Sequence, residues 1–325
     1  MKSLYHPVNL DFLEIPGNIF AAPMAGYTDA AARQLYLEGG ASAAFTEMVS
    51  AEALVRGSIR TRRMTDRAAG ESILAVQLFG SDPEVLGRAA AQLKKTGADL
   101  VDLNAACPVP KVTKKGAGAA LAGDTGRLFE AVEAMKECGL PVTVKIRAGW
   151  DNEKLNYIQA SQAAVRAGAA AVSFHPRTRS QGYSGKADWD RIKELTALIP
   201  VPVIGSGDLY RAEDARDMLL FTGCAAVMFA RGAVGKPDIF MQTVNLLEKG
   251  IIPSETEKEE QLKRALRHLE LAESLFGERR AFLDTKKHLA RYISGWETAT
   301  VLRRDVMRSP DMQSLKELLQ KNASL

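Results

Sequence analysis

The chain has 325 residues, a length that admits one large domain and a smaller second one. Hydrophobic residues make up 46% and charged residues 25%, as in ordinary globular proteins, and the net charge of +4 permits a polyanionic partner. No apolar run approaches the ~18 residues of a membrane-spanning helix, and the N-terminus lacks the apolar core of a signal peptide, so we expect a cytoplasmic protein that does not enter membranes.

Eight short apolar runs recur along the first part of the chain. Most of them are continuous rather than alternating, which is typical of strands that are covered on both faces in a parallel sheet. The runs are residues 19–24, 41–47, 73–79, 100–106, 142–148, 171–177, 201–207 and 225–231.

Helical signals lie between several of these runs. Residues 81–100 begin with Ser81 as an expected N-cap, carry Pro83 in the first turn and close at Gly97; similar segments close at Gly168 and Gly223. Eight strands joined by right-handed helical crossovers predict an α/β fold of the (β/α)8 (TIM) barrel type. The alternative is an open doubly wound sheet, but the glycine fingerprint that would favour it does not follow the first strand.

The sequence changes character after the eighth run. Residues 254–278 have the periodicity of an amphipathic helix, residues 282–296 and 312–321 are helical in pattern, and no strand signal is left. We therefore expect residues 1–245 to form a barrel and residues 246–325 to form an all-helical domain.

Every predicted strand becomes polar near its C-terminal end, where a barrel carries its active site. Lys145 lies within a strand, and such a charge requires an electron-rich partner, for which the pyrimidine edge of a reduced flavin is suitable. His175 is equally compatible with a histidine of the core. The glycine-rich turns at 205–208 and 230–237 have the position of a phosphate site. Three widely spaced cysteines and four scattered histidines predict neither a metal site nor a disulfide-linked partner.

Several ordered motifs resemble one enzyme family along nearly the whole chain. They include "APMAGYTD", "VQLFGSDPE", "DLNAACPVPKVTKKGAGAAL", "VTVKIRAGWD", "HPRTRSQGYSGKADWD" and "ARGAVGKPDIF". The sequence is similar to the tRNA-dihydrouridine synthases, most closely to the bacterial B-type (nifR3-like) branch. The resemblance implies an FMN-binding barrel and a helical domain that binds tRNA. It also implies that FMN, reduced by NADPH, passes a hydride to C6 of a uridine while a cysteine protonates C5.

The resemblance also assigns residues. Cys107 is the expected proton donor, and Ala106, which precedes it, stands where the family usually has glycine. The expected FMN-binding residues are Pro23, Met24, Ala25, Gln77, Lys145, His175, Ser206, Gly207, Asp208, Ala230 and Arg231.

RNA binding requires cations along the path of the phosphates, and basic residues cluster beside the expected active site and in the helical tail. Any one of them is more often part of a solvated face, and it is the clustering that favours RNA. The expected tRNA-binding residues are Asn104, Lys111, Lys114, Arg177, Arg179, Lys286, Lys287 and Arg291.

Two other functions compete with this interpretation. An FMN barrel that reduces a small molecule would not need the basic helical tail. A non-catalytic RNA-binding protein would not need Cys107 and Lys145. We expect a monomer.

Overall fold

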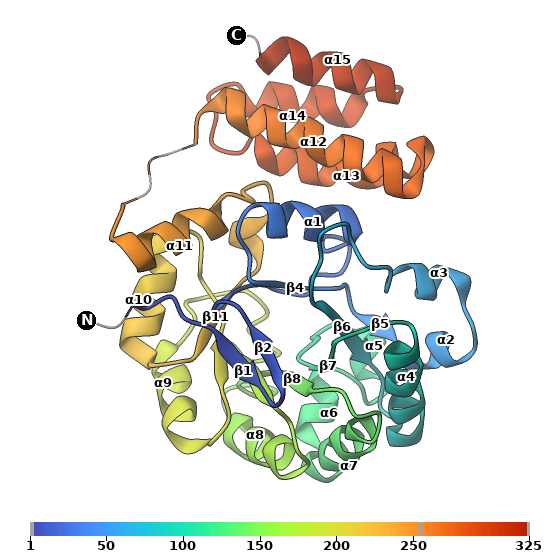
Figure 1. The fold of residues 1–325 in the computed structure, drawn as a ribbon, viewed down its shortest axis with the longest axis vertical. Coiled ribbons are helices and arrows are strands. Elements are labelled where there is room, and N and C mark those ends of the chain that lie inside the picture. Colours follow the sequence, from blue (N-terminus) through green and yellow to red (C-terminus); the bar gives the residue numbers. More distant parts are fainter. Residues whose placement is uncertain (1–2, 253, 255, 324–325) are drawn as a thin grey trace.

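The computed structural model describes residues 3–252, 254 and 256–323, and it contains a barrel with a helical domain on one side (Figure 1). Eight parallel strands pair in sequence around the barrel, and the β4–β6 and β3–β11 pairings close it. The predicted (β/α)8 fold is therefore confirmed. The strands are β3 (Ile19–Ala21), β4 (Ala43–Phe45), β6 (Leu74–Phe79), β7 (Leu100–Ala105), β8 (Val142–Arg147), β9 (Ala171–His175), β10 (Val203–Gly205) and β11 (Ala226–Phe229).

Helices cover the outside of the barrel. In α4, Asp82 rather than the expected Ser81 is the N-cap, because the Asp82 side chain accepts a hydrogen bond from the amide of Val85. The main outer helices are α1 (Ala30–Glu38), α4 (Pro83–Lys95), α7 (Thr125–Lys136), α8 (Tyr157–Arg166), α9 (Trp189–Leu198), α10 (Ala212–Thr222) and α11 (Ile239–Lys249). Shorter elements lie in the loops: β5 (Val49–Ser50), α2 (Ala51–Val55), α3 (Ile59–Arg63), α5 (Pro110–Thr113), α6 (Ala119–Gly123) and the 3-10 turn η1 (Arg231–Ala233).

A hairpin that the sequence did not predict closes the N-terminal end of the barrel. It consists of β1 (Val8–Leu10) and β2 (Leu13–Ile15), which pair antiparallel around a turn with Asp11 at a φ of 61°. Leu10 and Ile15 are fully buried against inward-facing barrel residues that include Phe20 and Phe45. The hairpin thus seals the end of the barrel opposite to the strand C-termini.

The C-terminal domain is a bundle of four helices, α12 (Lys258–Phe276), α13 (Glu278–Tyr292), α14 (Ala299–Arg308) and α15 (Met312–Ala323). Three of them were predicted, and α14 was not. Their own core includes Leu262, Leu289 and Leu315, and it continues onto Ala31 and Leu35 of α1, beside which the bundle lies in Figure 1.

The connection between barrel and bundle follows α11. This helix contains the predicted boundary between residues 245 and 246, and it packs on α10 and β3, so the whole helix belongs to the barrel. Residues 253 and 255 of the connection, and residues 1–2 and 324–325 of the predicted domains, lie outside the described residues. Within the described part, no helix combines the length and apolarity needed to cross a bilayer.

Candidate functional site

A pocket of about 460 Å³ opens at the C-terminal ends of the barrel strands. This volume lies within the range of about 300–1,000 Å³ that is usual for small-molecule and cofactor sites. Cys107, Asn104 and all eleven residues expected to bind FMN line it, together with Arg291 from α13 of the helical domain. Residues expected to act together from sequence alone are thus gathered around one cavity.

The alternation of side chains along the strands places polar groups on the inner surface of the barrel. On β7 these are Asp102 and Asn104, and on β8 they are Lys145 and Arg147, whereas the intervening apolar residues face the outer helices. The register pairs Asn104 with Lys145 and Arg147 with His175. The last inward-facing residues of neighbouring strands therefore meet at the mouth.

A chain of hydrogen bonds runs from the barrel interior to the loop that carries Cys107. The Thr143 hydroxyl donates to Asp102 (2.7 Å), and Gln77 Nε2 donates to the other carboxylate oxygen of Asp102 (2.6 Å). Asn104 Nδ2 donates to Gln77 Oε1 (2.7 Å), and the Cys107 amide donates to Asn104 Oδ1 (2.9 Å). Burial raises the pKa of Asp102 to about 6, and its two hydrogen bonds and Lys145 oppose that rise.

Asp102 and Thr143 were missed from sequence. The alternation of side chains along a strand could have indicated them. Each lies two residues before an expected site residue and therefore on the same face of its strand.

The loop that carries Cys107 is held rigidly. The Ala119 amide donates to the Cys107 carbonyl (3.1 Å). Gly118 has a φ of +62°, and a Cβ there would lie 2.7 Å from that carbonyl oxygen, so only glycine fits. In the described chain, the non-glycine residues with positive φ are Asp11 and Asp208. Ala106, at the position where the resemblance leads us to expect glycine, therefore has an ordinary negative φ.

Two basic side chains of the pocket lose basicity through burial. The pKa of Lys145 falls to about 8 because of burial and the neighbouring Arg147, with Asp102 opposing the fall. Burial and the surrounding cations, Lys145 first, hold the pKa of His175 well below its usual value, so the ring is neutral at pH 7. Its Nε2 lies 3.4 Å from Arg177 Nη1. Among the described residues, no hydrogen-bond partner is found for the Lys145 amine, which leaves it available to a ligand.

The turn after β10 has the features of a phosphate cradle. The amides of Gly207 and Asp208 donate no hydrogen bond to the described protein, and Arg231 from the neighbouring turn lines the same wall. Ser206, in contrast, is already engaged, because its amide donates to Phe174 and its hydroxyl to Met228. The backbone of Gly207 and Asp208 therefore offers the free donors here.

The residues expected to bind tRNA from the barrel fall into two groups. Lys111 and Lys114 are exposed in and just after α5, on the loop that follows Cys107. Arg177 is buried, and its guanidinium bonds to Asp208 (2.7 Å) and to two carbonyls of the loop that follows β9. Arg179 stacks on the ring of Trp150, at 4.5 Å from its centroid. The two lysines are thus exposed to solvent, whereas the guanidinium of Arg177 is bonded within the protein, to Asp208 and to the loop after β9.

The three expected residues of α13 also differ. Arg291 is exposed and lines the pocket, and Lys287 lies over the ring of Tyr27, which lines it too. Lys286 instead donates to the carbonyls of Met307 (3.3 Å) and Ser309 (2.8 Å) at the end of α14. Its amine therefore stabilises the bundle.

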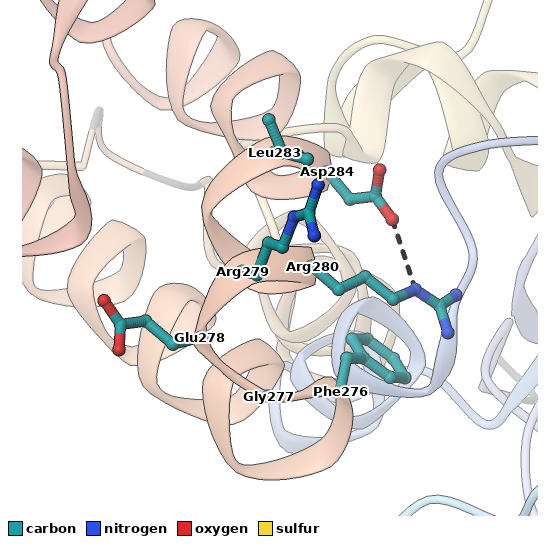
Figure 2. Close-up of a pocket in the computed structure, with 7 residues that line it drawn as sticks. All are labelled: Phe276, Gly277, Glu278, Arg279, Arg280, Leu283 and Asp284. Carbon is teal, nitrogen blue, oxygen red and sulfur yellow. Dashed lines mark hydrogen bonds and ion pairs between the residues drawn. The ribbon is translucent and has the colours of Figure 1, made fainter.

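A second hollow of about 440 Å³ lies at the turn between α12 and α13 and shares no residue with the barrel pocket (Figure 2). The Arg280 guanidinium stacks 4.5 Å from the centroid of Phe276 and pairs with Asp284, while Leu283 is exposed. The hollow holds cations and apolar groups but no thiol or imidazole, so we place the chemistry in the barrel.

Comparisons with known proteins bear on the barrel pocket. The family described as dihydrouridine synthase (Dus) matches residues 20–325. A protein of Treponema pallidum described as a probable tRNA-dihydrouridine synthase is 46% identical over 304 residues, which cover 90% of this chain and 89% of that protein. The tRNA-dihydrouridine synthase B of Shewanella oneidensis is 37% identical, over 86% of this chain and 87% of that protein.

Solved structures share the fold at low sequence identity. Histamine dehydrogenase from Rhizobium sp. 4-9 matches with a TM-score of 0.59 at 15% identity, over 83% of this chain and 51% of that chain, so this chain spans about half of its length. The old yellow enzyme homologue from Zymomonas mobilis matches with a TM-score of 0.53 at 14% identity, over 80% of this chain and 98% of that chain. Both comparisons concern the barrel architecture alone.

Proposed function

Because the chain belongs to the dihydrouridine synthase family, we propose that it is a tRNA-dihydrouridine synthase. In this proposal it reduces the C5–C6 double bond of specific uridines in cytoplasmic tRNA, using FMN that NADPH reduces again, and it acts as a monomer. The observation that carries the proposal is the pocket that Cys107, Lys145 and the Gly207 turn line together. Basic residues at the rim of the same pocket favour a polyanionic substrate over a small molecule.

The pocket fits a flavin phosphate on physical grounds. At the deep side, Lys145 has an unbonded amine whose charge would be stabilised by electron density on a reduced isoalloxazine ring. At the outer side, the free amides of Gly207 and Asp208 and the guanidinium of Arg231 would bind the phosphate. The strand ends at Pro23, Met24, Ala25 and Ala230 would contact the ring and its chain, beside Gln77 and His175. A bound, reduced flavin supplies the hydride for C6 of the uracil.

The role proposed for Cys107 is that of a general acid. Addition of a hydride to C6 leaves negative charge that is quenched when C5 receives a proton. The Cys107 loop holds a thiol at the pocket wall, and its amide is fixed by Asn104. The thiol gives its proton to C5, and solvent later returns a proton to the sulfur.

The target uridine must leave its stack to enter the barrel, at a cost of a few kcal/mol that is smaller for an already unstacked loop base. Lys111 and Lys114 lie on one side of the mouth, and Lys287 and Arg291 lie on the side of the helical domain. We propose that these four cations hold the phosphates of the flanking nucleotides while the base is inside.

The test uses purified protein, NADPH and tRNA from cells that lack this gene, with dihydrouridine measured by mass spectrometry. We expect Cys107→Ala to oxidise NADPH normally but to lose uridine reduction by ~10²-fold or more, the usual contribution of a general acid. Cys138→Ala, which removes a thiol from the hydrophobic core, is the matched control. Full uridine reduction by Cys107→Ala would place the acid elsewhere, and a protein that binds no FMN would refute the flavin-dependent function.

A further inference from the structure

Arg147 is a buried cation that the proposed chemistry does not yet use. It is the last residue of β8, its exposed fraction is 5%, and its side chain points to the barrel mouth. Its Nε donates to the carbonyl of Ala106 (3.0 Å), and its Nη1 donates to the carbonyls of Thr178 (3.0 Å) and Gly182 (2.9 Å). A buried guanidinium is stable only with such partners, so the three bonds fix where it lies.

The first of these bonds acts directly on the residue before the thiol. The Ala106 amide donates to Asn104 Oδ1 (3.1 Å), while its carbonyl accepts from Arg147. Ala106 is thus held through both of its backbone polar groups, and the next residue is Cys107. Asn104 supports the loop from β7, and Arg147 supports it from the neighbouring strand.

The other two bonds fix a second loop, which follows β9. Arg177 donates to the carbonyls of Ser184 and Gly185 in the same loop, so two buried arginines bind the backbone of residues 178–185 at four carbonyls. This loop places Tyr183, 58% exposed, on the pocket wall, where the guanidinium of Arg147 lies 5.5 Å from its ring centroid. Arg147 therefore joins the loop of the thiol to the loop that carries Tyr183.

Arg147 also brings a positive charge to the pocket that Cys107 lines. Burial lowers the pKa of Arg147, and the Tyr183 and Cys107 side chains partly oppose that fall. The guanidinium stays protonated, because its reference pKa is far above the working range. A permanent positive charge thus lines the same pocket as the Cys107 thiol.

We propose that Arg147 is a positioning residue for the proton donor, one that fixes the loop of Cys107 relative to the loop of residues 178–185. This inference rests on the proposed function. In the step itself the S–H bond breaks and a C5–H bond forms, with the S–H electron pair left on sulfur. The hydride from reduced FMN brings two electrons to C6, so the uracil is reduced and the flavin is oxidised. NADPH returns the two electrons, and solvent returns the proton.

The experiment compares Arg147→Lys with Arg67→Lys. Lysine keeps the charge but cannot make the forked bonds of a guanidinium. Arg67 is the matched control, because it also donates to backbone carbonyls, those of Glu71, Ser72 and Gly97, at the opposite end of the barrel. Each variant is measured in three ways: flavin reduction by NADPH, kcat and KM for tRNA, and hydrogen exchange of the peptide that contains Cys107.

We expect Arg147→Lys to reduce flavin within about twofold of the wild type, while kcat for uridine reduction falls ~10- to 100-fold, as for a misplaced catalytic group. The KM for tRNA should stay unchanged, since no phosphate contact is lost. Hydrogen exchange at the Cys107 amide should accelerate ~10-fold. The weaker hydrogen bonds made by lysine at position 147 lower the free energy of opening the Cys107 loop. Arg67→Lys should change none of these quantities.

Two kinetic results would overturn the proposal. One is a variant with normal kcat, and the other is a loss that is equal in flavin reduction and in uridine reduction. Hydrogen exchange is measured without substrate, so it also tests a variant that folds but reduces little uridine. Unchanged exchange at Cys107 in Arg147→Lys refutes the positioning role. If the wild type makes no dihydrouridine, the proposed function fails, and the exchange result still tests the contact of Arg147 with the loop.

Discussion

Gly207 offers the sharpest test of the proposed cofactor cradle. Its φ is +120°, and a Cβ built there would lie 2.9 Å from the Cβ of Ala187 and 2.9 Å from Cδ2 of His175. The substitution Gly207→Ala therefore adds a methyl group where both the backbone conformation and the space favour glycine. The clash is with His175, one of the residues that line the pocket.

The magnitude has two parts. A non-glycine residue in a sparsely populated backbone region costs about 1–3 kcal/mol, and overpacking of a filled site costs about as much again. Relief of the clash moves the His175 ring or the Gly207 turn, and with it the free amides. We expect at least ~2 kcal/mol of this cost to appear in cofactor binding, which is a ~30-fold increase in the Kd for FMN.

The assay is titration of apo-protein with FMN, followed by flavin fluorescence, together with urea unfolding. Gly223→Ala is the control, because Gly223 also has a positive φ (67°) but a Cβ there meets nothing within 4 Å. The control should lose about 1–2 kcal/mol of stability, the cost of a left-handed backbone conformation, and should keep its FMN affinity. An unchanged FMN Kd in Gly207→Ala would refute the reasoning about the cradle.

Three further predictions concern titration, RNA and the bundle. The pKa of Asp102 is raised from 3.8 to about 6, so the protonated carboxyl stabilises the folded state at low pH, and this contribution to the free energy of unfolding is lost as pH rises through about 6. Asp102→Asn should reduce the fall in unfolding free energy between pH 4 and pH 7 by about 2 kcal/mol, measured by urea unfolding at the two pH values. Arg291→Glu should raise the KM for tRNA and reduce the slope of the logarithm of the tRNA association constant against the logarithm of salt concentration by about one. The control Arg88→Glu, on the exposed surface of α4, should change neither quantity. Lys286→Met should lower the melting temperature with little effect on tRNA affinity, and a KM effect equal to that of Arg291→Glu would contradict the assignment of Lys286 to the bundle.

The fold and the gathering of the site residues could be predicted because both follow from local pattern. Parallel strands place their C-terminal ends together, so Gln77, Asn104 and Lys145 had to meet once eight strands were recognised. The β1–β2 hairpin escaped prediction because each strand has only three residues, too few to display a period.

The direction of long side chains could not be predicted in the same way. A guanidinium or an amine reaches several ångströms from its backbone, so sequence position does not decide whether it meets solvent or a buried carbonyl. Arg177 and Lys286 were expected to contact RNA, and both are occupied by carbonyls of the protein. The role of Arg147 likewise depends on two loops that lie far apart in the sequence.

The β1–β2 hairpin, which closes the N-terminal end of the barrel, also constrains the order in which substrates bind and products leave. With Leu10 and Ile15 closing the far end, the pocket is reached from the side of the strand C-termini. Under the proposed function, NADPH and tRNA would both enter from this side, and a base stacked on a bound flavin would occupy the face that a nicotinamide needs. Turnover should therefore alternate between NADPH and tRNA, and the oxidised nicotinamide should leave before tRNA enters. Steady-state kinetics should accordingly give parallel double-reciprocal lines, and excess tRNA should inhibit competitively against NADPH.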